Sequence, residues 1–96
     1  MKITYKTNVL DVIRLVENNT PELWEKEQSK FPNTWGGVNA LTKQIVKDLL
    51  VMIGLPYSKE LAGFVRYIVE CPNTMSYSEY KRSLIGKTVE DVIFEL

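Results

Sequence analysis

The sequence contains no histidine among its 96 residues. Histidine is the commonest general base near neutral pH, the commonest metal ligand, and the usual partner of serine or cysteine nucleophiles. Its absence excludes these uses. The glutamates and aspartates lie mostly on the polar faces or in the first turns of predicted helices, where structure alone explains them. We therefore expect no catalytic residue and no metal ligand, and we do not expect an enzyme.

Cysteine is almost absent as well. Cys71 is the single one, which excludes an intramolecular disulfide and a paired-cysteine metal site, so we predict a small buried thiol. The first residues lack the apolar stretch of a secretion signal. The longest apolar run, residues 49–53, is far too short to span a bilayer. These absences predict a cytoplasmic protein with no membrane partner.

The chain also lacks an excess of either charge, since 12 Lys and Arg balance 12 Asp and Glu. Proteins that bind nucleic acid usually carry a positive excess, because phosphate contacts supply much of their affinity. The balance therefore disfavours nucleic acid as a partner. With 45% hydrophobic and 25% charged residues, the composition is that of an ordinary globular protein. We expect residues 1–96 to form one domain.

Glycine is scarce where a phosphate-binding loop would need it. Gly86, Lys87 and Thr88 match the end of the pattern G-x-x-x-x-G-K-[ST], but Lys81 stands where the first glycine belongs. The preceding segment has a helical pattern rather than that of a strand. A helix end followed by a helix cap explains these residues, and no cofactor is expected.

The patterns that are present predict an all-α fold. Apolar residues recur at helical spacing through most of the chain, whereas residues 1–7 fit either a short strand or an arm. We expect helices over residues 9–17, 21–30, 38–53 and 59–71, a fifth between Ser76 and Gly86, and a short last element from residue 89, where a strand also fits. Connections are short, so the expected architecture is a compact bundle of five to six short antiparallel helices.

Capping residues set these boundaries. The predicted N-caps are Asn8, Thr20, Ser58, Ser76 and Thr88. Pro21 suits the first position of the second helix, and Ser76 with Glu79 has the spacing of a capping box. Gly54 is the expected end of the third helix. Residues 31–37 are the clearest predicted loop.

Aromatic residues suggest a binding surface near that loop. Trp24, Phe31 and Trp35 cluster around the second predicted helix, and Trp is over-represented at binding hot spots. Trp35 either folds back over the core, which we favour, or contacts a partner.

A second candidate surface is acidic. Glu22, Glu25 and Glu27 lie close together in the sequence, and Glu90, Asp91 and Glu95 form another acidic segment. An acidic face suits a basic site on a partner.

These features favour a non-enzymatic protein-binding module, most concretely a small inhibitor of immunity type or phage type that occludes a partner enzyme. The first alternative is a nucleic-acid-binding regulator of helix-turn-helix type. It would use cations at the following positions: Lys43, Lys47, Lys59 and Arg66, or Lys81, Arg82 and Lys87. The second alternative is an assembly or scaffold subunit, which would self-associate into a homo-oligomer.

Overall fold

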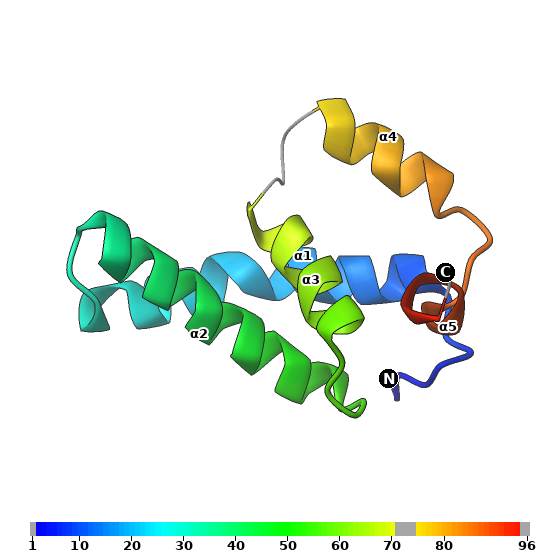
Figure 1. The fold of residues 1–96 in the computed structure, drawn as a ribbon, viewed down its shortest axis with the longest axis horizontal. Helices are drawn as coiled ribbons and strands as arrows, with labels where there is room; N and C mark the ends of the chain where they lie inside the picture. Colours follow the sequence, from blue (N-terminus) through cyan, green and yellow to red (C-terminus); the bar gives the residue numbers. More distant parts are fainter. Residues whose placement is uncertain (1, 71–74, 95–96) are drawn as a thin grey trace.

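A computed structural model describes residues 2–70 and 75–94. Within these ranges the chain forms five α-helices and one 3-10 turn, without a strand (Figure 1). They are α1 (Val9–Glu27), η1 (Gln28–Lys30), α2 (Trp35–Ile53), α3 (Lys59–Glu70), α4 (Met75–Ser83) and α5 (Val89–Ile93). The predicted all-α fold is confirmed. The predictions for Cys71 and Glu95 fall outside the described residues.

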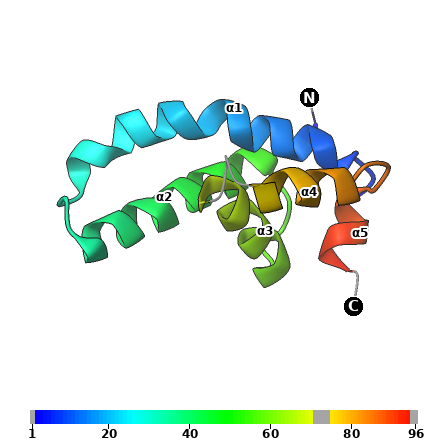
Figure 2. The same ribbon diagram turned by 90° about the horizontal axis from the view of Figure 1, so that it is seen from above.

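Helix α1 replaces the two helices that were predicted over residues 9–17 and 21–30, with a break at Asn18 and Asn19. The helix runs through both residues and through Pro21. Thr20, the predicted N-cap, instead donates its hydroxyl to the carbonyl of Val16 at 2.6 Å. Proline inside a helix removes one backbone hydrogen bond and bends the axis, and Figure 2 shows α1 as an arc.

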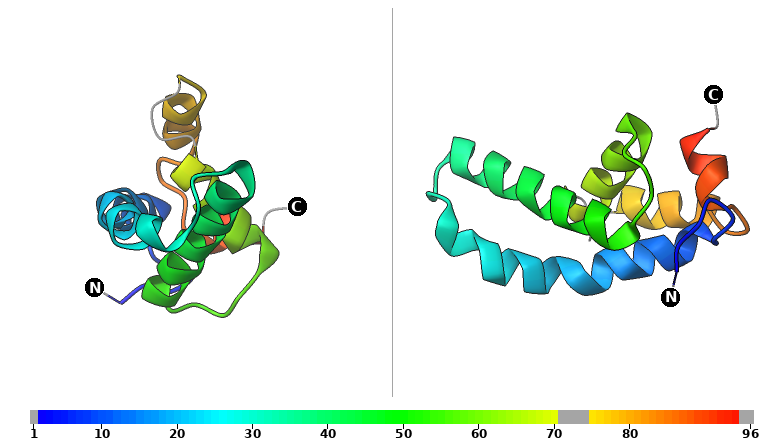
Figure 3. Two further views of the ribbon diagram at one scale, coloured as in Figure 1. Left: turned by 90° about the vertical axis from the view of Figure 1, so that its left-hand side faces the viewer. Right: turned by 90° about the horizontal axis from the view of Figure 1, so that it is seen from below.

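Helices α1 and α2 form an antiparallel hairpin closed by η1 and the residues before Trp35 (Figure 2). Helix α3 packs against both of them and turns out of the plane of the pair (Figure 3). Helix α3 has 12 residues, whereas α1 and α2 have 19 each, and it crosses the pair rather than running along it (Figure 2). The closed end of the hairpin therefore projects beyond α3.

The core lies where α1, α2 and α3 meet. Its centre consists of side chains with almost no exposure, and these are Val12, Val16, Ile45, Leu49 and Val65. Burial of each such side chain contributes about 1.5–3 kcal/mol relative to leaving it exposed. Val38 and Met52 are spaced along α2 so that, with Leu41, Ile45 and Leu49, they would form one apolar stripe, but they are 38% and 47% exposed. Val46 and Ile53 are buried there.

The N-terminal residues form a single antiparallel bridge, Asn8 to Thr88, rather than a strand. Backbone hydrogen bonds join Val9 N–H to the Lys87 carbonyl and Val89 N–H to the Thr7 carbonyl, both at 2.9 Å. The bridge brings the starts of α1 and α5 together, and the last element is helical.

Several predicted helix ends are confirmed. The Asn8 side chain accepts the N–H of Leu10 at 3.0 Å, and Ser58 Oγ accepts that of Leu61 at 3.0 Å. Gly54 ends α2 in the left-handed conformation at φ 76°, which glycine adopts at least cost. Ser76, however, lies inside α4 rather than at its cap. In the described ranges, no helix combines the length and apolar character that crossing a bilayer requires.

Candidate functional site

A hollow of about 370 Å³ opens at the projecting end of the hairpin, beside the end of α3. Trp24 of α1 and Trp35 of α2 line it together. The remaining lining residues come from α2 and α3 and are Val38, Asn39, Thr42, Arg66, Val69 and Glu70. We call this site the tryptophan hollow. It has the mixture of apolar walls and few polar groups that is typical of binding sites.

Trp35 does not fold back over the core, so the favoured prediction for it was wrong. It is 91% exposed, whereas Trp24 is 36% exposed. Trp35 nevertheless lies on the core-facing side of α2, because it precedes the buried Ile53 by 18 residues, or five full turns. Helix α3 crosses the pair and does not cover this end of α2 (Figure 2). The apolar stripe of α2 therefore continues into solvent at Trp35.

The start of α2 is fixed by a cap and a close backbone approach. Thr34 Oγ1 accepts the N–H of Gly37 at 3.0 Å, which makes Thr34 the N-cap and places Trp35 in the first turn. A Cβ on Gly37 would lie 2.0 Å from the carbonyl oxygen of Pro32, so only glycine fits there. The loop therefore ends at Thr34, and α2 begins three residues before the predicted start at Val38.

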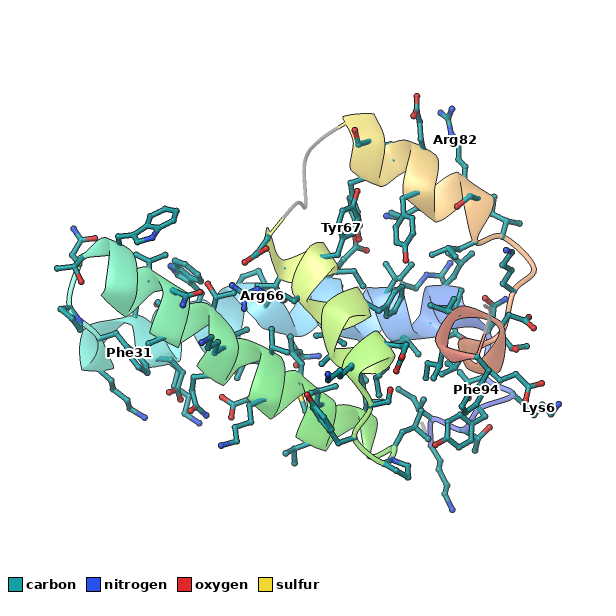
Figure 4. All side chains as sticks on the ribbon, in the orientation of Figure 1. Lys6, Phe31, Arg66, Tyr67, Arg82 and Phe94 are labelled. Carbon is teal, nitrogen blue, oxygen red and sulfur yellow. The ribbon has the colours of Figure 1, made fainter. Side chains whose placement is uncertain are left out.

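The polar edge of the hollow is a chain of three side chains. The Arg66 guanidinium donates to Asn39 Oδ1 and, through Nε, to Glu70 Oε1, both at 2.9 Å. Figure 4 shows Arg66 between α3 and α2. Arg66 therefore has a carboxylate and an amide oxygen as partners at this edge of the hollow. In the nucleic-acid alternative, Arg66 was one of the cations expected to contact the nucleic acid.

The other predicted site residues lie apart from the hollow. Phe31 is half-buried against the core at the end of the hairpin (Figure 4). Glu27 was expected on an acidic face, but it is only 7% exposed and pairs with Lys30 at 3.4 Å. Its position continues the core-facing side of α1. Glu22 and Glu25 are exposed.

The cations proposed for nucleic-acid binding are dispersed. Lys43 and Lys47 are exposed on α2, and Lys59 is exposed at the start of α3. Lys81 pairs with Glu17 at 3.1 Å. With Arg66 and Lys81 paired to carboxylates, neither group of cations forms a continuous unpaired basic surface in the described part of the chain.

Two other polar clusters stabilise the fold. Tyr77 of α4 donates its hydroxyl to Glu17 of α1 at 2.7 Å, and burial together with this carboxylate raises the pKa of Tyr77 far above its usual value. At the start of α5, Asp91 accepts the N–H of Thr88 at 2.8 Å. That hydrogen bond lowers the pKa of Asp91. Both carboxylates thus have structural partners.

The described residues contain no group of three or more His, Cys, Asp or Glu arranged to hold a metal ion. Two α3 residues of the hollow, Val69 and Glu70, were not predicted as site residues, because their approach to Trp35 depends on how α3 crosses the hairpin. The start of α2 could have been predicted from Thr34, since threonine is a favoured N-cap residue and a cap there places the first turn of the helix at Trp35.

Comparison with protein-family models, curated proteins and solved structures finds no match.

Proposed function

We propose that this protein is a non-enzymatic binding module that contacts a partner protein through the tryptophan hollow. The observation that carries the proposal is Trp35, which is 91% exposed on the core-facing side of its helix. Tryptophan is enriched at binding hot spots because it buries a large apolar area and keeps a polar N–H. Burial of roughly 200 Å² of an indole contributes about 5 kcal/mol before the costs of association.

The finer form of the proposal is a small inhibitor that occludes a partner enzyme. It is supported by the fixed backbone at Trp35, because the Thr34 cap and the approach of Gly37 to Pro32 hold the first turn of α2 in place. A backbone that is fixed before binding loses less conformational entropy in the complex. Such preorganisation suits a tight stoichiometric inhibitor.

Site-specific photo-crosslinking in the native host tests the proposal. A photoreactive amino acid at Val38, on the rim of the hollow, should crosslink one protein. The same group at Val51, which is 78% exposed on α2 and outside the hollow, is the matched control. With the crosslinked protein purified, Trp35→Ala should weaken the complex by roughly thirtyfold or more.

Because Trp35 is so exposed, its substitution should change the free energy of unfolding by less than about 0.5 kcal/mol. A weakened complex would then report on the contact rather than on misfolding. Equal crosslinking from both positions, or unchanged affinity in Trp35→Ala, would contradict the proposal. For an inhibitor, the purified partner enzyme should lose activity with the native protein and keep it with Trp35→Ala.

A further inference from the structure

The tryptophan hollow carries one positive and one negative side chain, and they neutralise each other. Arg66 Nε lies 2.9 Å from Glu70 Oε1. A phosphate at Arg66 would lie beside this carboxylate, and a ligand cation at Glu70 would lie beside the guanidinium, so either ligand would be attracted by one charge and repelled by the other. The lining is therefore complementary to an uncharged group.

The walls determine what kind of uncharged group fits. Trp24, Trp35, Val38 and Val69 supply apolar surface. The hydroxyl of Thr42, which also lines the hollow, donates to the Val38 carbonyl at 3.0 Å. A volume of about 370 Å³ lies at the small end of the range of roughly 300–1,000 Å³ for ligand pockets. This space suits one large apolar side chain together with its backbone.

The polar edge remains able to bind a main chain. The two hydrogen bonds from Arg66 end on Asn39 Oδ1 and Glu70 Oε1. In the described part of the chain, this leaves the Asn39 amide N–H groups and Glu70 Oε2 for a ligand. A peptide unit has one N–H donor and one C=O acceptor, and both must be satisfied when buried. The edge offers one counterpart to each.

We infer that the tryptophan hollow receives a polypeptide segment of the partner, with one large uncharged apolar side chain between Trp24 and Trp35. The backbone beside that side chain hydrogen-bonds to Asn39 and Glu70. This inference rests on the proposed function and adds the chemistry of the ligand. Neutral charge, apolar walls and a donor and acceptor on one edge together select a protein segment over a nucleic acid or a cationic ligand.

The probe for this inference is N-acetyl-L-phenylalaninamide, which has one apolar side chain and two amide groups. Titrated into the whole isotope-labelled protein, it should shift the indole N–H resonances of Trp24 and Trp35 in a saturable way. A fragment of this size should bind with a dissociation constant on the order of millimolar. N-acetyl-L-lysinamide and inorganic phosphate should leave both resonances in place.

Two variants test the polar edge. Asn39→Ala should weaken binding of the probe by roughly two- to tenfold through loss of a hydrogen bond. Lys43→Ala changes an exposed residue of α2 outside the hollow and should not affect it. Asn39 is exposed and alanine is a good helix former, so both variants should fold.

An absence of indole shifts at tens of millimolar probe, or larger shifts with phosphate or the lysine amide, would overturn the inference. This outcome is distinct from failure of the proposed function. If Trp35→Ala abolishes the protein complex but the probe does not bind, the function stands and the ligand chemistry is wrong. If the probe binds but crosslinking detects no partner at the hollow, the proposed function fails.

Discussion

Gly37 shows how a single residue positions the hollow. Its Cα approaches the Pro32 backbone so closely that a Cβ would lie 2.0 Å from the carbonyl oxygen and 2.9 Å from the carbonyl carbon. Real Cβ atoms do not make such contacts, so the backbone would have to move. Gly36 is different, because a Cβ there meets no atom within 4 Å. The two adjacent glycines therefore have different roles.

Gly37→Ala should destabilise the protein by about 1–3 kcal/mol, because the added methyl group forces apart two backbone segments. Gly36→Ala is the matched control. It should leave stability unchanged or raise it by up to about 1 kcal/mol, because alanine favours the helix. Urea denaturation of both variants measures the difference. If the two variants were equally stable, Pro32 would not constrain the start of α2.

The sequence indicated the chemistry of the site at the residue scale but not which side chains would be exposed. Trp24 and Trp35 were both selected as binding residues because of their type, and both line the hollow. Burial of Trp35 was predicted from its residue type, since tryptophan is seldom left in water, and its core-facing position on α2 was not recognised because residues 31–37 were assigned to a loop. Exposure depends on whether another helix covers that position. The prediction for Glu27 was wrong in the opposite direction. Its residue type suggested exposure, whereas its position in the helical repeat of α1 indicated burial.

At the scale of an element, α1 shows that periodicity can outweigh a local start signal. Thr20 and Pro21 look like a cap and a first helical residue, and this predicted a new helix. The buried positions Val16, Leu23 and Glu27 nevertheless continue one stripe across the proline. That stripe was readable from the sequence. A single bent helix keeps it facing the core, whereas a chain reversal at Asn18 would not.

The short helix α5 depends on its cap. Asp91 accepts hydrogen bonds from the N–H of Thr88 at 2.8 Å and from its hydroxyl at 3.1 Å. These bonds lower the pKa of Asp91 below its ordinary value, because they favour the charged carboxylate. The folded protein thus holds this proton less tightly than the unfolded chain. The stability that Asp91 contributes is present above the unfolded pKa and is lost as the pH falls through the folded pKa.

Asp91→Asn should therefore reduce the free energy of unfolding near neutral pH, where the charged cap is fully formed. The difference from the native protein should shrink as the pH is lowered from about 6 to about 3, across the titration of an ordinary aspartate. Denaturation at several pH values measures it. Glu79→Gln removes an exposed carboxylate of α4 and serves as control. A difference that stayed constant with pH would contradict a role for the charged cap.

Across the whole molecule, the tryptophan hollow arises from the place where α3 crosses the α1–α2 pair. Three elements meet there because α3 packs on the α1–α2 pair yet leaves the closed end of the pair uncovered. The sequence predicted the all-α class and the α2–α3 turn at Gly54, since these follow from local patterns. It could not predict which end of the hairpin α3 would leave uncovered. That depends on the crossing of packed helices, to which many residues contribute.

Helix α4 is held differently from α1, α2 and α3. Among its described side chains only Tyr77 is buried, at 2% exposure. Its hydroxyl bonds Glu17, and its ring lies 6.2 Å from that of Tyr67 (Figure 4 labels Tyr67 in the space beneath α4). Local openings occur first where few apolar contacts hold an element. We therefore expect α4 to open while α1, α2 and α3 remain packed together.

Native-state hydrogen exchange tests this hierarchy with two variants. Tyr77→Phe should lower the opening free energies of α4 and of the core equally, by about 1 kcal/mol, because both openings break the bond to Glu17. Ile45→Val, at a fully buried position of α2, should lower only the core opening, by about 0.5–1.5 kcal/mol. Its side chain stays packed when α4 opens alone. If Ile45→Val lowered both openings equally, α4 and the core would instead unfold as one cooperative unit.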